Sequence, residues 1–356
     1  MTDFHILRVK DIQRETEDTV SITMDVPQQL KKLFAYKQGQ YLTFKKDIDG
    51  EDLRRSYSLC SSPVTDEDWQ VAVKKVENGK FSTYANETLK AGDVLEVMAP
   101  MGSFYTEVKE GQKKNYSAFV AGSGITPVMS IIKTVLHTET DSSFVLYYGN
   151  KNTASTIFKK ELDALSEKYA DRLTVHYVMS REEVAGAIKG RINAEMCLGL
   201  VNDHQNIFKA DEYFLCGPEE MIFSVKDELS KQGVSKDNIH FELFNTPVQK
   251  ENDSSSDEDS IVLDAEVMVI IDGEEHEFTL NSKGDSILDA AMDAGADVPF
   301  SCKGAVCCTC RAKLVEGKAR MALNYSLTDK EVEEGYILTC QSHPTTEKVV
   351  VDYDAD

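Results

Sequence analysis

Short segments in which apolar and polar residues alternate fill the first third of the chain. The segments are VSITMDV, QYLTFKK, SYSLCSS, WQVAVKKV and DVLEVMAP, and turn formers separate them at Gly39, Asp49-Gly50, Pro63 and Asn78-Gly79. Alternation with a period of two is typical of half-buried β-strands, and closely spaced turns connect neighbouring strands. We therefore predict a small antiparallel β-barrel over residues 1–112, with one helix near Ser82–Leu89.

From residue 113 to 246, buried apolar strands alternate with amphipathic helices. The strand segments are YSAFVAG, FVLYYGN, LTVHYVMS, YFLCGP and IHFELF, and the helical segments are PVMSIIKTVLH, FKKELDALSEKYA and EEMIFSVKDELSKQG. This alternation predicts an α/β domain with a mostly parallel, doubly wound sheet. Such sheets bind ligands at the carboxyl ends of their strands.

The composition changes again after residue 246. The segment PVQKENDSSSDEDS, residues 247–260, offers almost nothing apolar to bury, and we predict a flexible acidic linker there. In residues 261–356, VLDAEVMVIIDGEEHEFTL predicts a hairpin that turns at Asp272-Gly273, and SILDAAMDAGAD predicts a short helix. We expect a third, α+β domain, so the chain of 356 residues is multidomain.

Negative charge is concentrated in the C-terminal third. The net charge of the chain is -22, and from Glu251 onward 24 Asp and Glu stand against 8 Lys and Arg. A surface of this sign repels nucleic acid and anionic membranes, and it suits a basic docking face on a protein partner. No segment approaches the roughly 20 apolar residues of a membrane span, and the N-terminus lacks the apolar core of a secretion signal. We expect a cytoplasmic protein.

Four of the eight cysteines lie between Cys302 and Cys310. Disulfides do not persist in a reducing cytosol, so clustered thiols indicate a metal site. Cys302-x4-Cys307-x2-Cys310, with Cys340 thirty residues later, has the plant-type spacing of a [2Fe-2S] cluster. A zinc site is the alternative, but zinc sites more often pair two Cys-x2-Cys knuckles. We predict that these four cysteines ligate the cluster and that Cys308 does not.

The stretch PFSCKGAVCCTCRAKLVEG, together with LTCQSHP, resembles the plant-type ferredoxin domain over about residues 262–354. The resemblance implies a β-grasp-like fold with all four ligand positions present.

Two segments of the predicted barrel have the chemistry that a flavin nucleotide requires. Arg55-Ser56-Tyr57-Ser58 ends a predicted strand, and Gly79-Lys80-Phe81-Ser82 precedes the predicted helix. They offer an aromatic face, a hydroxyl for the flavin N5, and cationic and helix N-terminal groups for a pyrophosphate. Taken alone, the first segment is better explained as an exposed Arg beside a half-buried strand Tyr.

In the order GQY (39–41), RSYS (55–58), GKFS (79–82) and PMGSF (100–104), these motifs resemble the ferredoxin-NADP reductase family. The resemblance implies that Arg55 binds flavin phosphate, Tyr57 stacks on the ring, Ser58 approaches N5, and the helix start receives the pyrophosphate of FAD, in preference to FMN. The flavin-binding residues expected are Arg55, Ser56, Tyr57, Ser58, Val73, Lys74, Gly79, Lys80, Phe81 and Ser82.

The segment AGSGITP, residues 121–127, follows an apolar strand and opens a helix, as a pyrophosphate site does. The segment CGP, residues 216–218, ends a later strand, where a small side chain and a glycine leave space for a nicotinamide ring. A plain tight turn and a buried cysteine are the alternatives. Both segments resemble the NAD(P) motifs of the same family. The nucleotide-binding residues expected are Gly122, Ser123, Gly124, Thr126, Pro127, Ser180, Arg181, Cys216, Gly217 and Pro218.

Ser180-Arg181 follows the strand LTVHYVM, where the family holds the 2'-phosphate of NADP, and an Arg fork fits a phosphate. NADPH is therefore favoured, with NADH as the alternative. Glu242 in ELF resembles the Glu-x-Phe of the family's C-terminal strand and is a candidate for a proton path beside the flavin. The catalytic residues expected are Ser58, Cys216 and Glu242.

All three blocks together resemble the flavin and iron-sulfur reductase components of bacterial multicomponent oxygenases. The resemblance implies electron transfer from NADPH through FAD and the cluster to a protein acceptor. An oxygenase component, a desaturase, a cytochrome and a separate ferredoxin all stay open as that acceptor. A non-catalytic redox sensor or regulatory electron carrier is the alternative from another class, but the intact nucleotide motifs argue against it.

Overall fold

A computed structural model describes residues 4–200, 208–245 and 262–355. They form two compact units, one within Asp3–Phe244 and one within Asn245–Asp356. The predicted linker, residues 247–260, lies outside the described residues. No helix in the described part of the chain has the length and apolar character that a membrane crossing requires.

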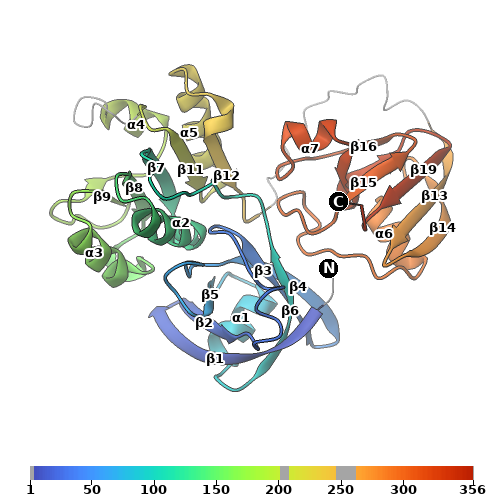
Figure 1. The fold of residues 1–356 in the computed structure, drawn as a ribbon, viewed down its shortest axis with the longest axis horizontal. Coiled ribbons are helices and arrows are strands. Elements are labelled where there is room, and N and C mark those ends of the chain that lie inside the picture. The colour runs from blue at the N-terminus through green and yellow to red at the C-terminus, as the bar shows by residue number, and fades with distance from the viewer. Residues whose placement is uncertain (1–3, 201–207, 246–261, 356) are drawn as a thin grey trace. The chain divides into compact units, whose positions relative to one another are not determined.

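The first unit begins with an antiparallel barrel whose strands follow the order β4-β3-β6-β1-β2-β5 (Figure 1). Completely buried side chains such as Leu7, Phe44 and Val97 fill its interior. Helix α1 begins at Lys80, two residues before the predicted start. The elements are β1 (Phe4–Thr16), β2 (Thr19–Asp25), β3 (Tyr41–Ile48), β4 (Glu51–Ser58), β5 (Trp69–Lys74), α1 (Lys80–Glu87) and β6 (Val94–Met101).

A parallel sheet in the order β10-β9-β8-β7-β11-β12 forms the second half of this unit, as predicted. Helices α2 and α3 cover one face, and α4 and α5 cover the other (Figure 1). The strands are β7 (Asn115–Ala121), β8 (Ser143–Asn150), β9 (Leu173–Met179), β10 (Ile188–Lys189), β11 (Glu212–Cys216) and β12 (Ile239–Glu242). The helices are η1 (Gly122–Gly124), α2 (Ile125–Thr138), η2 (Thr153–Ser155), α3 (Lys159–Lys168), α4 (Ala194–Leu200), α5 (Glu219–Lys231) and η3 (Lys236–Asn238). Strand order reverses between β7 and β11, where doubly wound sheets bind their ligands.

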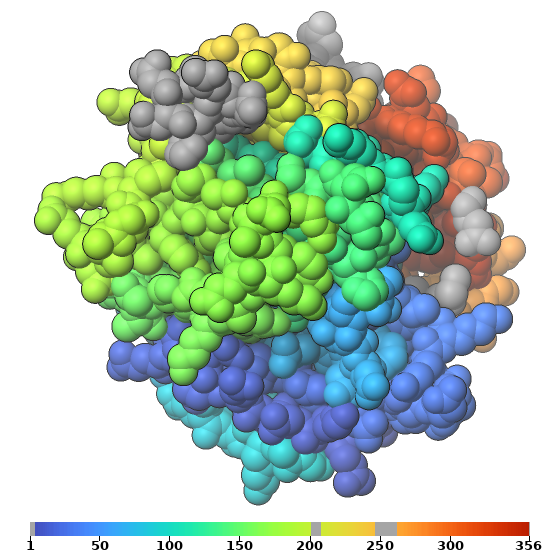
Figure 2. Space-filling model, turned by 60° about the vertical axis from the view of Figure 1, so that its left-hand side comes forward, coloured from blue at the N-terminus to red at the C-terminus, as the bar shows by residue number. Residues whose placement is uncertain are grey.

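Polar contacts join the barrel to the parallel-sheet half along a seam between the loop 60–66 and helix α2. The Ser130 hydroxyl donates to the Ser61 carbonyl oxygen at 2.6 Å, and the hydroxyls of Ser62 and Thr134 lie 2.9 Å apart. All of these side chains are buried. In the space-filling view the parallel-sheet half, in green, lies directly against the barrel, in blue (Figure 2). The two halves therefore pack as one unit.

The second unit contains a mixed sheet in the order β14-β13-β19-β15-β17. The hairpin turns at Asp272-Gly273 as predicted, with Ile271 paired to Glu274, and β19 joins β13 in parallel. Helix α6 buries one face, which carries its own residues Ile287, Leu288 and Ala291. The elements are β13 (Asp264–Ile271), β14 (Glu274–Asn281), α6 (Ile287–Asp293), β15 (Arg311–Glu316), β16 (Ala319–Met321), α7 (Asp329–Glu333), β17 (Tyr336–Leu338), η5 (Thr339–Gln341), β18 (Ser342–Pro344) and β19 (Lys348–Asp352).

Candidate functional site

The three predicted catalytic residues meet at the ends of three strands. Ser58 ends β4, Cys216 ends β11 and Glu242 ends β12. Cys216 and Glu242 are partners in the parallel register of β11 and β12, and the Ser58 hydroxyl donates to the Glu242 carboxylate at 2.9 Å. Ser58 and Cys216 are buried. A hydroxyl, a thiol and a carboxyl from both halves of the unit thus share one site.

The environment of this site favours neutral side chains. Burial raises the pKa of Glu242 to about 7, although the hydrogen bond from Ser58 acts in the opposite direction. Burial also raises the pKa of Cys216, and the negative charge of Glu242 adds to the effect. Cys216 is therefore a neutral thiol at physiological pH, which suits a small packing residue beside a ring better than a nucleophile. Glu242 is able to hold or release a proton near neutral pH.

Aromatic rings surround the predicted flavin position on β4. Tyr57 stacks on Phe81 of α1 with 5.6 Å between ring centroids, and it also approaches Phe44. Ser56 is bonded to Thr43 of the neighbouring strand at 2.9 Å. Arg55 is exposed on the same strand. The strand therefore presents an aromatic face and a cation along one edge, which are groups that a flavin nucleotide requires.

The start of α1 is shaped by its own side chains. The Ser82 hydroxyl accepts a hydrogen bond from the Val76 backbone at 3.2 Å and donates to the Gly79 carbonyl at 3.1 Å. Ser82 therefore fixes the turn before the helix, while Lys80 forms an ion pair with Glu51. The first N–H groups of a helix have no intrahelical acceptor, so this end of α1 suits a pyrophosphate.

The other flavin candidates lie on β5, and the remaining barrel motifs meet nearby. Val73 is fully buried in the barrel, and the Lys74 ammonium lies 3.6 Å from Asp18. Gln40 of GQY donates to the Gly102 carbonyl of PMGSF at 3.1 Å. The motifs at 39–41 and 100–104 are thus in contact.

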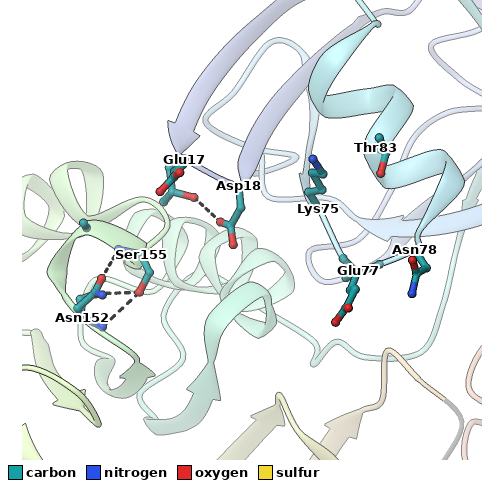
Figure 3. Close-up of a pocket in the computed structure, with 11 residues that line it drawn as sticks. Glu17, Asp18, Lys75, Glu77, Asn78, Thr83, Asn152 and Ser155 are labelled. Atoms are coloured by element: carbon teal, nitrogen blue, oxygen red, sulfur yellow. Dashed lines mark hydrogen bonds between the residues drawn. The ribbon is translucent and has the colours of Figure 1, made fainter.

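A pocket of about 680 Å³ lies between the barrel and η2, next to the start of α1 (Figure 3). Its volume is within the range of small-molecule sites. No sequence motif pointed to it, since the β1–β2 turn and η2 supply much of its polar wall. The lining residues are Thr16, Glu17, Asp18, Lys75, Val76, Glu77, Asn78, Thr83, Asn152, Ala154 and Ser155.

The two predicted nucleotide motifs pack against each other at the point where strand order reverses. A Cβ atom on Gly124 would lie only 2.1 Å from the Cys216 carbonyl oxygen, so no other residue fits there. The Thr126 hydroxyl donates to the Ser123 carbonyl at 3.0 Å, and Pro127 is buried in the first turn of α2. Thr126 thus shapes the loop itself.

The residues after Gly217 and those after β9 complete the carboxyl edge of the sheet. Pro218 is the N-cap of α5. Beyond β9, the backbone N–H of Ser180 donates to the Asn150 carbonyl oxygen. The backbone N–H of Arg181 donates to the Lys151 carbonyl oxygen at 2.9 Å. Lys151 and Arg181 are both exposed, so two cations lie on adjacent chain segments. Sequence reasoning missed Lys151, which belongs to no motif.

The four predicted cluster ligands form two pairs. The sulfurs of Cys302 and Cys307 lie 3.1 Å apart, and the hydrogen bond from Cys307 lowers the pKa of Cys302 to about 6. A hydrogen bond from Cys310 likewise lowers the pKa of Cys340. The Gly304 backbone N–H also donates to the Cys302 sulfur at 3.3 Å. Paired, thiolate-stabilising cysteines fit two irons that each take two protein ligands.

The Cys308 thiol forms a hydrogen bond outside these two pairs. Its thiol donates to the Ser326 carbonyl oxygen at 3.4 Å. Within residues 4–200, 208–245 and 262–355, no three His, Cys, Asp or Glu side chains converge on one point as a single metal ion requires. The hydrogen bond to Ser326 favours a position of Cys308 outside the ligand set.

Three family models match successive parts of the chain. Residues 6–105 match the oxidoreductase FAD-binding domain, residues 119–227 the oxidoreductase NAD-binding domain, and residues 269–345 the 2Fe-2S iron-sulfur cluster binding domain. The predicted cofactors FAD, a nicotinamide nucleotide and a [2Fe-2S] cluster are confirmed by these matches.

Relatives with similar sequences match over nearly their whole length. The chain is 43% identical to a component of 1,2-phenylacetyl-CoA epoxidase from Escherichia coli (strain K12), covering 100% of this chain and 99% of the relative. It is 34% identical to the ferredoxin reductase component of 3-ketosteroid-9-alpha-monooxygenase from Rhodococcus rhodochrous, covering 98% and 96%. Among solved structures, phthalate dioxygenase reductase has the same fold, with a TM-score of 0.60 at 24% identity over 98% of both chains.

Proposed function

Because the chain belongs to the family of FAD- and [2Fe-2S]-containing reductase components of multicomponent oxygenases, we propose that it oxidises NADPH and delivers the electrons to an oxygenase component. The predicted resemblance to these reductases, the one from phenylacetyl-CoA epoxidase among them, is confirmed. When bound, the flavin accepts a hydride and gives up single electrons, and the cluster carries them singly. The chain's own residues bind, orient and shield these groups.

The observation that carries this proposal is the meeting of Ser58, Cys216 and Glu242. Ser58 comes from the flavin half and Cys216 from the nucleotide half, and Glu242 contacts both. A hydride donor beside Cys216 and an acceptor beside Ser58 would therefore lie next to each other, as direct transfer requires. Glu242, with its raised pKa, is the proposed proton carrier at the edge of this site.

The flavin proposal assigns Tyr57 to the ring and the start of α1 to the pyrophosphate. The pocket beside Asn78 and Thr83 then takes the adenosine half, for which its carboxylates, amides and hydroxyls are suitable partners (Figure 3). FMN has no such half, so a polar pocket next to the pyrophosphate position supports FAD. Asn152→Leu should weaken binding of FAD much more than binding of FMN to flavin-free protein.

The coenzyme proposal is NADPH, bound through its 2'-phosphate by Ser180 and Arg181, with Lys151 beside them. Arg181→Ala should raise the KM for NADPH roughly ten- to a hundredfold and change the KM for NADH little, because a charged hydrogen bond to phosphate is lost. Lys160→Ala, an exposed cation on α3, is the control and should change neither. Equal effects on both coenzymes would reject the assignment.

The acceptor proposal is an oxygenase component of the phenylacetyl-CoA epoxidase kind that presents a basic docking face. It is supported by the 43% identity over the whole chain and by the acidic C-terminal third. The test is NADPH-driven reduction of purified oxygenase components from the epoxidase and from a ketosteroid monooxygenase, with the epoxidase component expected to be faster. No dye reduction with either coenzyme would favour the non-catalytic redox sensor instead.

A further inference from the structure

We propose that Tyr148 is a positioning residue for the coenzyme: it holds the loop Gly122–Gly124 so that backbone N–H groups face the pyrophosphate, without touching the coenzyme itself. The inference rests on the proposed nucleotide site and deepens it. Tyr148 lies on β8, next to β7, whose end continues into this loop.

Tyr148 is buried directly beneath the loop. Its side chain has no exposed surface, whereas Gly122 and Ser123 are partly exposed. The hydroxyl donates to the Gly122 carbonyl oxygen at 3.0 Å and lies 3.3 Å from the Ile157 carbonyl oxygen. Burial raises the pKa of Tyr148, so the hydroxyl stays a donor at physiological pH. The tyrosine thus connects the loop to the chain that follows η2.

The direction of the Gly122 carbonyl determines where the next N–H points. In a trans peptide the C=O and N–H groups point in opposite directions, and no described peptide bond is cis. The Gly122 carbonyl is drawn inward by Tyr148 and by the Ile125 backbone N–H, while Thr126 draws in the Ser123 carbonyl. The N–H groups of Ser123 and Gly124 are therefore turned away from the core.

This arrangement is the one that an anion requires. Successive outward N–H groups form a concave cradle with partial positive charge, and carbonyl oxygens in the same place would repel a phosphate. Gly122 has a φ of +56°, a conformation that favours glycine and bends the loop into this shape. Without the Tyr148 hydroxyl, one of the two bonds that hold the Gly122 carbonyl is lost, and its peptide is freer to rotate.

The neighbouring strand provides a matched control. Tyr177 of β9 is the register partner of Tyr148, and its ring lies 6.3 Å away. Its hydroxyl donates to Asp163 of α3 at 2.7 Å, so it forms a comparable bond that does not involve the loop. Removing either hydroxyl removes a tyrosine hydrogen bond from the same side of the sheet, but only one of the two bonds orients Gly122.

The experiment compares Tyr148→Phe and Tyr177→Phe in the full-length protein loaded with flavin and cluster. Tyr148→Phe should raise the KM for NADPH and for NADH alike, roughly two- to tenfold, since both coenzymes share the pyrophosphate. It should leave kcat for dye reduction, flavin content and cluster absorption unchanged. NADP⁺ titration should show the same weakening of Kd. Tyr177→Phe should leave both KM values within about twofold.

Three results would overturn the inference: an unchanged KM in Tyr148→Phe, an equal rise in both variants, or a rise for NADPH alone. The second would indicate general loosening of the sheet, and the third would indicate contact with the 2'-phosphate. Failure of the proposed function would look different, because the wild-type protein would then oxidise neither coenzyme.

Discussion

The hydroxyl of Ser58 donates to the carboxylate of Glu242 across 2.9 Å, although the two residues are 184 positions apart in the sequence. The bond joins the last residue of β4 to the last residue of β12. The barrel and the parallel sheet therefore share a titratable group at their common edge. The protonation state of Glu242 depends on both halves of the unit.

The first prediction concerns the pH dependence of stability. Burial raises the pKa of Glu242 from its ordinary value of 4.5 to about 7, so the folded chain binds this proton more tightly than the unfolded chain. The resulting stabilisation is complete below about pH 4.5 and is lost as the pH rises through about 7. In flavin-free protein, Glu242→Gln should therefore reduce the fall in Tm between about pH 4.5 and about pH 7, measured by thermal unfolding.

A second variant checks the cause of this pH dependence. The Ser58 hydrogen bond lowers the pKa of Glu242, so Ser58→Ala should move the midpoint of the fall in Tm to higher pH. Identical pH profiles for wild type, Glu242→Gln and Ser58→Ala would show that Glu242 does not titrate in this range.

The second prediction concerns the cluster ligands. Changing Cys302, Cys307, Cys310 or Cys340 to Ser should abolish the optical and paramagnetic signals of the [2Fe-2S] cluster while flavin stays bound. Cys308→Ser should retain both signals, because the Cys308 thiol is bonded to Ser326 outside the two ligand pairs. The assignment is wrong if Cys308→Ser loses the cluster and Cys307→Ser keeps it.

The third prediction concerns the contact between the two nucleotide motifs. Gly124→Ala places a Cβ atom 2.1 Å from the Cys216 carbonyl oxygen, and backbone atoms there cannot move aside without displacing β11. Binding of NADPH and NADH should both weaken by about five- to 150-fold, as overpacking at one such contact costs about 1–3 kcal/mol. Gly199→Ala in α4 meets no atom within 4 Å and is the matched control, with unchanged coenzyme titrations. Normal affinity in Gly124→Ala would refute the close approach.

The fourth prediction concerns delivery to the acceptor. The acidic C-terminal third should attract a basic partner over long distances, so the acceptor-reduction rate should fall as salt shortens the screening length from about 10 Å at 0.1 M to about 3 Å at 1 M. Flavin reduction at saturating NADPH should change much less, because it occurs inside a bound complex. Stopped-flow measurement of both steps separates them. An acceptor-reduction rate that does not change with salt would contradict the proposal of a basic docking face.

The local sequence pattern was sufficient to predict strands whose buried residues alternate. It was insufficient to predict strands that are mostly polar. Strand β1 was not among the predicted strands, because only Leu7, Val9 and Thr16 of its thirteen residues are buried. Register shifts near Val9 and after Arg14 also break its period of two. Strand β19 was missed for another reason: the short run Lys348–Asp352 is defined by parallel pairing with β13, about eighty residues earlier.

The candidate site shows the same limit. The motifs placed Ser58, Cys216 and Glu242 at strand ends. No local pattern predicts that strand ends from two different sheets lie next to each other. The pocket has no motif because turns from both halves form it. Tyr148 looks like any buried strand tyrosine until the loop above it is seen.

The seam between loop 60–66 and α2 limits how this protein can be recombined with its relatives. A graft of the parallel-sheet half alone, made to change coenzyme preference, would separate Ser130 from the Ser61 carbonyl and Thr134 from Ser62. It would also leave Asp66 without Lys133, the ammonium of which lies 3.2 Å away. Chimeras should therefore exchange the barrel loop and α2 together, whereas a crossover after Phe244 cuts none of these bonds.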